Sequence, residues 1–198
     1  ERVPNDIVRL MLLLKARSLS YGNSGVQVET VQRLIDFYNE GVTPIVYNQG
    51  SLGASGDLAP LAHLCLPLIG MGAVEYNGQT RPAADVLDEL GWKPLHMKSK
   101  EGLALLNGTQ FMSAHGVWAV TRARRLADLA NLVAAMSLDA FDGRIEPFGA
   151  EVNEVRNHAG QIHVAAKIRD LLNGSEISAQ PKKRVQDPYS FRCIPQVH

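Results

Sequence analysis

Apolar residues recur at three- and four-residue spacing along most of the chain, and this spacing places side chains on one face of an α-helix. The first such run contains Ile7, Leu10, Met11 and Leu14. Runs of the same kind predict helices over residues 6–19, 28–38, 57–71, 83–90, 99–106, 109–141 and 161–172. We therefore expect a mainly helical protein.

One short segment between the predicted helices has a β pattern. Residues 74–76 and 79–81 flank Asn77-Gly78, and an Asn-Gly pair between two such runs is a strong signal for a two-residue hairpin turn. The predicted fold class is all-α, with mainly long, bundle-forming helices and a small β-hairpin near 74–81. Residues 1–198 are expected to form a single fragment, with no division into domains. The segment 174–184 is the best candidate for disorder.

The charge balance and the cysteine content of the chain argue against several classes of function. Of 198 residues, 45% are hydrophobic, and 20 Lys and Arg balance 20 Asp and Glu, so charge gives no case for nucleic acid or membrane partners. Cys65 and Cys193 stand far apart with no C-x-x-C motif, which argues against a disulfide framework. Because residues 1–6 are polar and lack a signal-peptide pattern, a cytoplasmic location is expected.

The tripeptide Ala54-Ser55-Gly56, inside a glycine-rich run from 50 to 61, has what a backbone needs to make its own electrophile. The nitrogen of Gly56 would attack the carbonyl carbon of Ala54, the ring would lose water, and Ser55 would lose its hydroxyl as a second water. The product is a 4-methylidene-imidazol-5-one, an electron-poor alkene. Gly56 suits the close approach because it has no Cβ. An ordinary Gly/Ser turn before a helix, with Asp57 facing that helix's N-terminus, is the alternative.

The longer run GSLGASGDLAPLAHL at 50–64 resembles the signature of the aromatic amino acid ammonia-lyases, which carry this self-made group. Three further segments resemble the histidine branch of that family, in the same order: LSYGNSGV at 19–26, KEGLALLNGTQ at 100–110, and VQDPYSFRC at 185–193. The resemblance therefore covers nearly the whole chain. It implies a methylidene-imidazolone built from Ala54, Ser55 and Gly56, with no metal and no external cofactor.

The resemblance also assigns roles to four other residues. Arg192 would hold the substrate carboxylate, for which its planar, charged fork is suited, with the hydroxyl of the catalytic Tyr189 beside it and Gln186 lining the same site. Asn107 would lie against the prosthetic ring and the substrate. Without the resemblance, a Tyr-x-x-Arg pair is more typical of surface or intersubunit packing, and Asn107 would be an ordinary helix-end residue.

The implied reaction is elimination of ammonia from an L-amino acid. QDPYS at 186–190 is closer to the histidine enzymes than to the phenylalanine enzymes, which favours L-histidine and the product urocanate. A phenylalanine or tyrosine ammonia-lyase, an aminomutase with the same group, and a non-catalytic helical scaffold remain alternatives. Histidines give little support for a metal site, since His158 and His163 are five residues apart rather than four.

The resemblance further implies a homotetramer whose active sites draw residues from several subunits. In the family, a comparable segment is an inner part of a much longer chain. We therefore expect an internal fragment that lacks the family's N-terminal part, where its usual general base lies, and its C-terminal helical region. Such a fragment is expected to be inactive alone.

Overall fold

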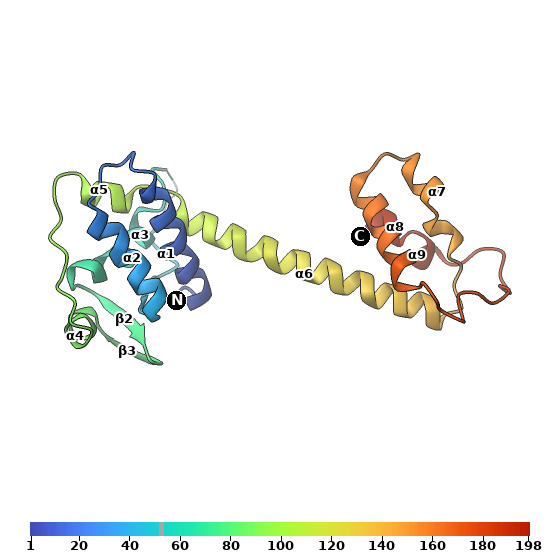
Figure 1. The fold of residues 1–198 in the computed structure, drawn as a ribbon, viewed down its shortest axis with the longest axis horizontal. Helices are drawn as coiled ribbons and strands as arrows, with labels where there is room; N and C mark the ends of the chain where they lie inside the picture. Colours follow the sequence, from blue (N-terminus) through green and yellow to red (C-terminus); the bar gives the residue numbers. More distant parts are fainter. Residues whose placement is uncertain (52–53) are drawn as a thin grey trace. The chain divides into compact units, whose positions relative to one another are not determined.

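The computed structural model describes residues 1–51 and 54–198, so Leu52 and Gly53 of the glycine-rich run lie outside the described residues. The chain forms two compact units, 1–120 and 121–198 (Figure 1). Helix α6 (Gln110–Ala140) contributes its first part to unit 1 and the remainder to unit 2. The prediction of a mainly helical fold is confirmed.

Unit 1 is built around a helix pair, α1 (Asn5–Ser20) and α2 (Val28–Glu40), which pack against each other. Helix α3 (Leu58–Cys65) contacts α1 and lies beside α5 (Glu101–Leu106), while α4 (Ala83–Glu89) packs against the small sheet. The apolar faces of these elements meet in one core. Its fully buried side chains include Met11, Leu12, Leu34, Phe37, Leu61, Leu64, Leu68 and Leu87.

The predicted hairpin is confirmed and forms part of a three-stranded antiparallel sheet, β1-β2-β3. Strands β2 (Ala73–Tyr76) and β3 (Gln79–Pro82) are joined at Asn77-Gly78, both with positive φ, as a two-residue hairpin turn requires. The third strand, β1 (Thr43–Pro44), which the sequence did not predict, pairs with β2. A two-residue strand has no periodicity that could reveal it in the sequence.

The helix predicted over 57–71 is shorter than expected. After α3 the chain tightens into a 3₁₀ turn, η1 (Leu66–Ile69), with Pro67 near its start. Proline has no N–H to continue the i to i−4 hydrogen bonds, and its ring crowds the preceding turn, so the α-helix ends here. Gly70, with φ of +78°, then closes the turn.

Unit 2 packs the end of α6 with α8 (Ala159–Leu171) and several short elements around a second core. These short elements are η2 (Glu146–Phe148), α7 (Ala150–Glu154), α9 (Tyr189–Arg192) and α10 (Ile194–Val197). The sequence did not predict η2 or α7. Buried in this core, the Asn153 amide donates to the carbonyls of Pro147 and Gly149 and accepts from Gln161 Nε2.

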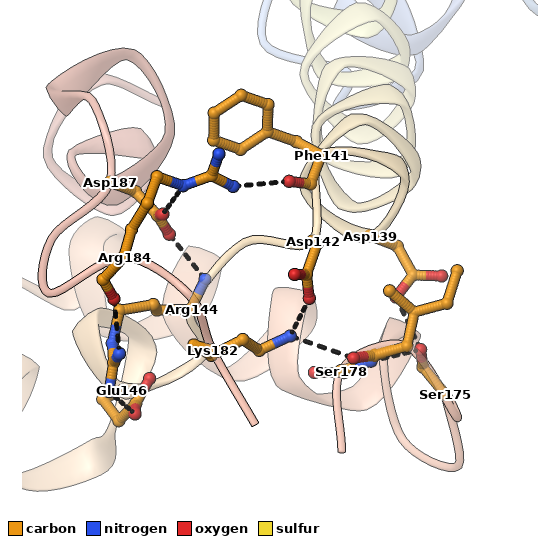
Figure 2. Close-up of polar contacts among 11 residues, drawn as sticks. Asp139, Phe141, Asp142, Arg144, Glu146, Ser175, Ser178, Lys182, Arg184 and Asp187 are labelled. Atoms are coloured by element: carbon orange, nitrogen blue, oxygen red, sulfur yellow. Dashed lines mark hydrogen bonds and ion pairs between the residues drawn. The ribbon is translucent and has the colours of Figure 1, made fainter. Parts of the chain in front are cut away.

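The segment 174–184 contains no helix or strand, but the expectation of disorder is not supported. Ser175 donates to Asp139, and Lys182 donates both to Asp142 and to the Ile177 carbonyl, so the segment is tied to the end of α6 (Figure 2). Among the helices that the structure describes, none combines the length and apolar character needed to cross a bilayer.

Candidate active site

The tripeptide Ala54-Ser55-Gly56 forms a tight, largely exposed turn in unit 1. Ala54 and Gly56 pair in an isolated bridge, so the backbone folds back on itself within three residues. Gly56 has φ of +90°, and a Cβ there would come within 2.5 Å of the Gly108 carbonyl oxygen. Only glycine fits this cradle, and the bridge between Ala54 and Gly56 lies within the tripeptide whose backbone would close the ring.

Asp57 anchors the end of this turn, in a way that differs from the sequence prediction. It precedes α3 as its N-cap residue, but its side chain makes no cap hydrogen bond there. Instead the buried carboxylate accepts from the Met112 N–H, 3.0 Å away in the first turn of α6, and from the Ser51 hydroxyl at 3.4 Å. Asp57 therefore links the loop to the N-terminus of α6, where a negative charge is favoured.

The turn at Asn107-Gly108 provides the wall behind the tripeptide. The Asp57 N–H donates to the Gly108 carbonyl at 2.9 Å, so the two turns are bonded backbone to backbone. Asn107 ends α5 as its C-cap residue, and its exposed side-chain amide donates to the Leu103 carbonyl at 3.1 Å. The structure thus brings Asn107 beside the loop through its backbone, with its side chain turned to its own helix.

Lys15 lies under this turn. Its side chain is 1% exposed, and Nζ donates to the Asn107 carbonyl oxygen at 2.7 Å. Burial lowers the pKa of Lys15 to about 8, since a charged group is costly away from water. The neighbouring Cys65 is also buried, and burial raises the pKa of its thiol to about 12, so it stays a neutral core residue.

The remaining candidates, Gln186, Tyr189 and Arg192, belong to unit 2. Gln186 and Arg192 line one cavity of about 520 Å³, together with Arg144, Glu146, Pro147, Val152, Val185 and Asp187. Tyr189 is 73% exposed and is not among the residues that line this cavity. The Arg192 guanidinium donates from Nε to the Asp187 carbonyl at 3.1 Å, and this hydrogen bond holds the Nε end of the guanidinium group in place.

A polar network holds the walls of this cavity (Figure 2). The buried Asp187 carboxylate accepts from the Arg144 N–H at 2.5 Å and lies 3.5 Å from Arg184 Nε. Arg144 also donates to the Arg184 carbonyl and to Glu146. The Arg184 guanidinium lies over the Phe141 ring, 3.9 Å from the ring centroid, and donates a hydrogen bond to the backbone carbonyl of Phe141.

Arg192 is the residue of this cavity best suited to an anionic ligand. Two guanidinium groups, those of Arg144 and Arg192, line the cavity with the Gln186 amide and the carboxyl groups of Glu146 and Asp187. Arg144 is paired with Glu146, whereas Arg192 donates to the neutral Asp187 carbonyl and Cys193 Sγ. A guanidinium group such as that of Arg192 can bind a carboxylate by charge-assisted hydrogen bonds. Among residues 1–51 and 54–198, no group of three His, Cys, Asp or Glu side chains is arranged to hold a metal ion.

A family model described as "Aromatic amino acid lyase" matches residues 1–198, the whole chain. The chain belongs to the aromatic amino acid lyase family. A histidine ammonia-lyase of Deinococcus radiodurans is 52% identical over an alignment of 201 positions, which covers all of this chain and 38% of that protein. This member of the aromatic amino acid lyases thus spans little more than a third of the length of such a relative.

Solved structures agree with this membership of the aromatic amino acid lyase family. The histidine ammonia-lyase of Trypanosoma cruzi superposes with a TM-score of 0.87 and 41% identity, over 100% of this chain and 36% of that one. Tyrosine aminomutase from Streptomyces globisporus gives a TM-score of 0.91 and 36% identity, over 98% of this chain and 40% of that one. The fold is therefore shared by both a lyase and an aminomutase.

Sequence reasoning missed Lys15 and Arg144 and did not find the partner of Asp57. For Lys15 there was a signal, since it continues the apolar spacing of Leu12 and Leu19 in α1 and so must face the core. A lone lysine on the buried face of a helix needs a polar partner. Arg144 had no such signal, because its partner depends on the path of a loop about forty residues later.

Proposed function

We propose that the chain is the prosthetic-group segment of a histidine ammonia-lyase, and that the full-length protein eliminates ammonia from L-histidine to give urocanate. One observation carries the proposal: the turn at Ala54-Ser55-Gly56 folds back on itself, and its third residue sits in a cradle that only glycine fits.

The residues present fit ring closure in chemical terms. The bond that forms joins the Gly56 nitrogen to the Ala54 carbonyl carbon. The Ala54 oxygen leaves as water with the hydrogens of the Ser55 and Gly56 nitrogens, and the Ser55 hydroxyl leaves as a second water with the Ser55 Cα hydrogen. No oxidant or reductant is needed. The resulting methylidene-imidazolone would supply an electrophile that helps expel the substrate's amine.

The residues of unit 2 would bind the substrate. Arg192 would hold the carboxylate with its planar fork, and Gln186 would line the same cavity. Tyr189 would present its hydroxyl beside Arg192 in the assembled enzyme. The general base that removes the β-hydrogen would come from outside residues 1–198, so this segment alone would be inactive.

Histidine is the favoured substrate because the QDPYS segment and the 52% identical relative, itself named a histidine ammonia-lyase, point the same way. The aminomutase alternative is supported by the likeness to tyrosine aminomutase. Amino acid turnover separates them: a lyase releases urocanate and ammonia, whereas an aminomutase returns a β-amino acid. A non-catalytic scaffold would release neither and would not need the ring.

Assembly into a homotetramer is supported by α6, which carries large exposed apolar side chains of the kind that pack between helices. These are Met112, Val117, Val120, Leu126, Leu129, Leu132, Val133 and Met136. Both cysteines, Cys65 and Cys193, are free thiols, which fits the cytoplasm, where thiols stay reduced.

The deciding experiment is an intact mass of the full-length protein, with peptide mapping across residues 42–71. A deficit of two waters at Ala54-Ser55-Gly56, together with urocanate formed from L-histidine, would support the proposal. The Ser55→Ala variant should lose both signals and keep its fold, because the substitution removes the leaving hydroxyl and little packing. A Ser55→Ala enzyme with wild-type turnover would overturn the proposed chemistry.

A further inference from the structure

A lysine occupies a position in α1 where packing alone would favour an apolar residue. Lys15 is 1% exposed, and its neighbours on the same face, Leu12, Ala16 and Leu19, are all buried. Burying an ammonium group costs free energy unless a polar partner offsets the loss of water. A lysine at this position therefore requires a polar partner for its ammonium group.

The structure shows where that ammonium group acts. Lys15 Nζ donates to the Asn107 carbonyl, 92 residues away, and the next residue, Gly108, accepts the Asp57 N–H through its own carbonyl. The same Gly108 carbonyl closes the cradle around Gly56. Two hydrogen bonds, joined through Gly108, thus connect Lys15 with Asp57, the residue that follows the tripeptide.

The Asn107-Gly108 peptide needs such support. Asn107 ends α5, and the carbonyl groups at a helix C-terminus lack partners within the helix. Gly108 has φ of +143°, and glycine adopts many backbone conformations at similar cost, so the residue does not hold this geometry by itself. A donor with a positive charge at a helix C-terminus fixes the carbonyl by both hydrogen bonding and electrostatics.

We propose that Lys15 is a positioning residue for formation of the prosthetic group, holding the Asn107-Gly108 peptide as the wall against which Gly56 is kept while its nitrogen attacks Ala54. The inference rests on the proposed function, since it concerns how that group is made. Lys15 touches none of the reacting atoms. Its contribution is to keep the wall from moving away when ring closure strains the turn.

The test compares Lys15→Met with the wild type in the full-length protein. Methionine keeps the length and apolar stem of the side chain and removes the donor. Protein made by cell-free synthesis is sampled over time, and the fraction of the 42–71 peptide that lacks two waters gives the rate of ring closure. We expect Lys15→Met to slow closure by about tenfold or more, the size expected for losing one hydrogen bond from a charged donor.

A packing control comes from the same helix. Met11→Ala removes a fully buried side chain one turn away and leaves the Lys15–Asn107 bond in place. It should lower the thermal midpoint and leave the closure rate near that of the wild type, whereas Lys15→Met should leave the midpoint unchanged or raised. Equal slowing in both variants would mean that Lys15 acts only through stability and would overturn the inference.

The outcomes also separate this inference from the proposed function. If the wild type never loses two waters, the proposed function fails and the inference fails with it. If the wild type closes the ring and Lys15→Met closes it at the same rate, the proposed function stands and the inference alone is overturned.

Discussion

Gly56 and Gly108 approach so closely that no side chain fits between them: a Cβ at Gly56 would lie 2.5 Å from the Gly108 carbonyl oxygen. The same oxygen accepts the N–H of Asp57 at 2.9 Å, so the two turns cannot separate without breaking a hydrogen bond. The glycine of the tripeptide is thus required by its surroundings as well as by ring chemistry.

Substituting Gly56 by alanine should therefore block formation of the ring. The new methyl group would push the turn away from Gly108, and the left-handed backbone would add its own strain, for a combined cost of about 2–4 kcal/mol. In the full-length protein, the two-water deficit at residues 54–56 should disappear, and urocanate production with it. Mass spectrometry and the absorbance of urocanate provide the two readouts.

Gly41 offers a matched control for this substitution. It has φ of +73°, close to the conformation of Gly56, but no atom lies within 4 Å of where its Cβ would be. Gly41→Ala should cost about 1 kcal/mol from backbone strain alone and leave the ring intact. If Gly41→Ala prevents ring formation as strongly as Gly56→Ala, then strain rather than the contact with Gly108 is responsible.

Arg192→Lys should raise KM for L-histidine by about tenfold, with a smaller effect on kcat. A lysine keeps the charge but cannot hold a carboxylate with two parallel hydrogen bonds. Steady-state kinetics on the full-length enzyme measure the change. The exposed Arg156 lies outside the cavity lining and serves as control, since Arg156→Lys should leave KM unaltered. An unchanged KM in Arg192→Lys would remove that residue from carboxylate binding.

Asp187→Asn should loosen the segment that carries Gln186 and Arg192. The buried carboxylate accepts the Arg144 N–H and faces Arg184, and loss of its charge should cost about 1–3 kcal/mol of unfolding free energy. We expect KM to rise as well, because the cavity walls lose their anchor. Urea unfolding and kinetics on the same preparation measure both effects.

The ion pair of Lys167 with Asp128 provides the comparison for Asp187, since it lies in the same unit but is largely exposed to solvent. Asp128→Asn should change stability little, because exposed ion pairs contribute weakly. A wild-type KM in Asp187→Asn, measured on folded protein, would contradict the role of this network in shaping the cavity.

The sequence predicted what depends on neighbouring residues and missed what depends on distant ones. The spacing of apolar residues located the long helices, and Asn77-Gly78 located the hairpin, since both signals are local. Strand β1 at 43–44 escaped because it exists only through pairing with Glu75 and Val74, some thirty residues later. Its two residues carry no pattern of their own.

In the candidate site, too, the sequence predicted the features that depend on neighbouring residues and missed those that depend on distant ones. The tripeptide chemistry at 54–56 could be predicted because the reacting groups are adjacent in the sequence. The partner of Asp57 could not, because the nearest helix N-terminus in sequence, that of α3, is not the one its carboxylate binds, and Met112 lies 55 residues away. Choosing between two helix ends requires the tertiary fold.

Glu101 should make unit 1 sensitive to acid. Its carboxylate is 1% exposed and accepts from the backbone N–H groups of Gln27 and Lys98, the Gln27 amide and the Thr30 hydroxyl. Burial by itself would raise the pKa of Glu101, but these four hydrogen bonds outweigh it and lower the pKa from 4.5 to about 2. The carboxylate ties the start of α2 to the start of α5.

The lowered pKa of Glu101 determines how the free energy of unfolding depends on pH. Between pH 4.5 and about 2 the unfolded chain binds a proton at Glu101 that the folded chain does not, so stability is present above this window and falls as the pH drops through it. Glu101→Gln should cost about 1–3 kcal/mol at neutral pH and flatten this part of the acid dependence. Glu40→Gln, at an exposed position near the end of α2, should keep the wild-type curve. Urea unfolding at a series of pH values tests both variants, and an acid dependence in Glu101→Gln as steep as in the wild type would place the sensitive carboxylate elsewhere.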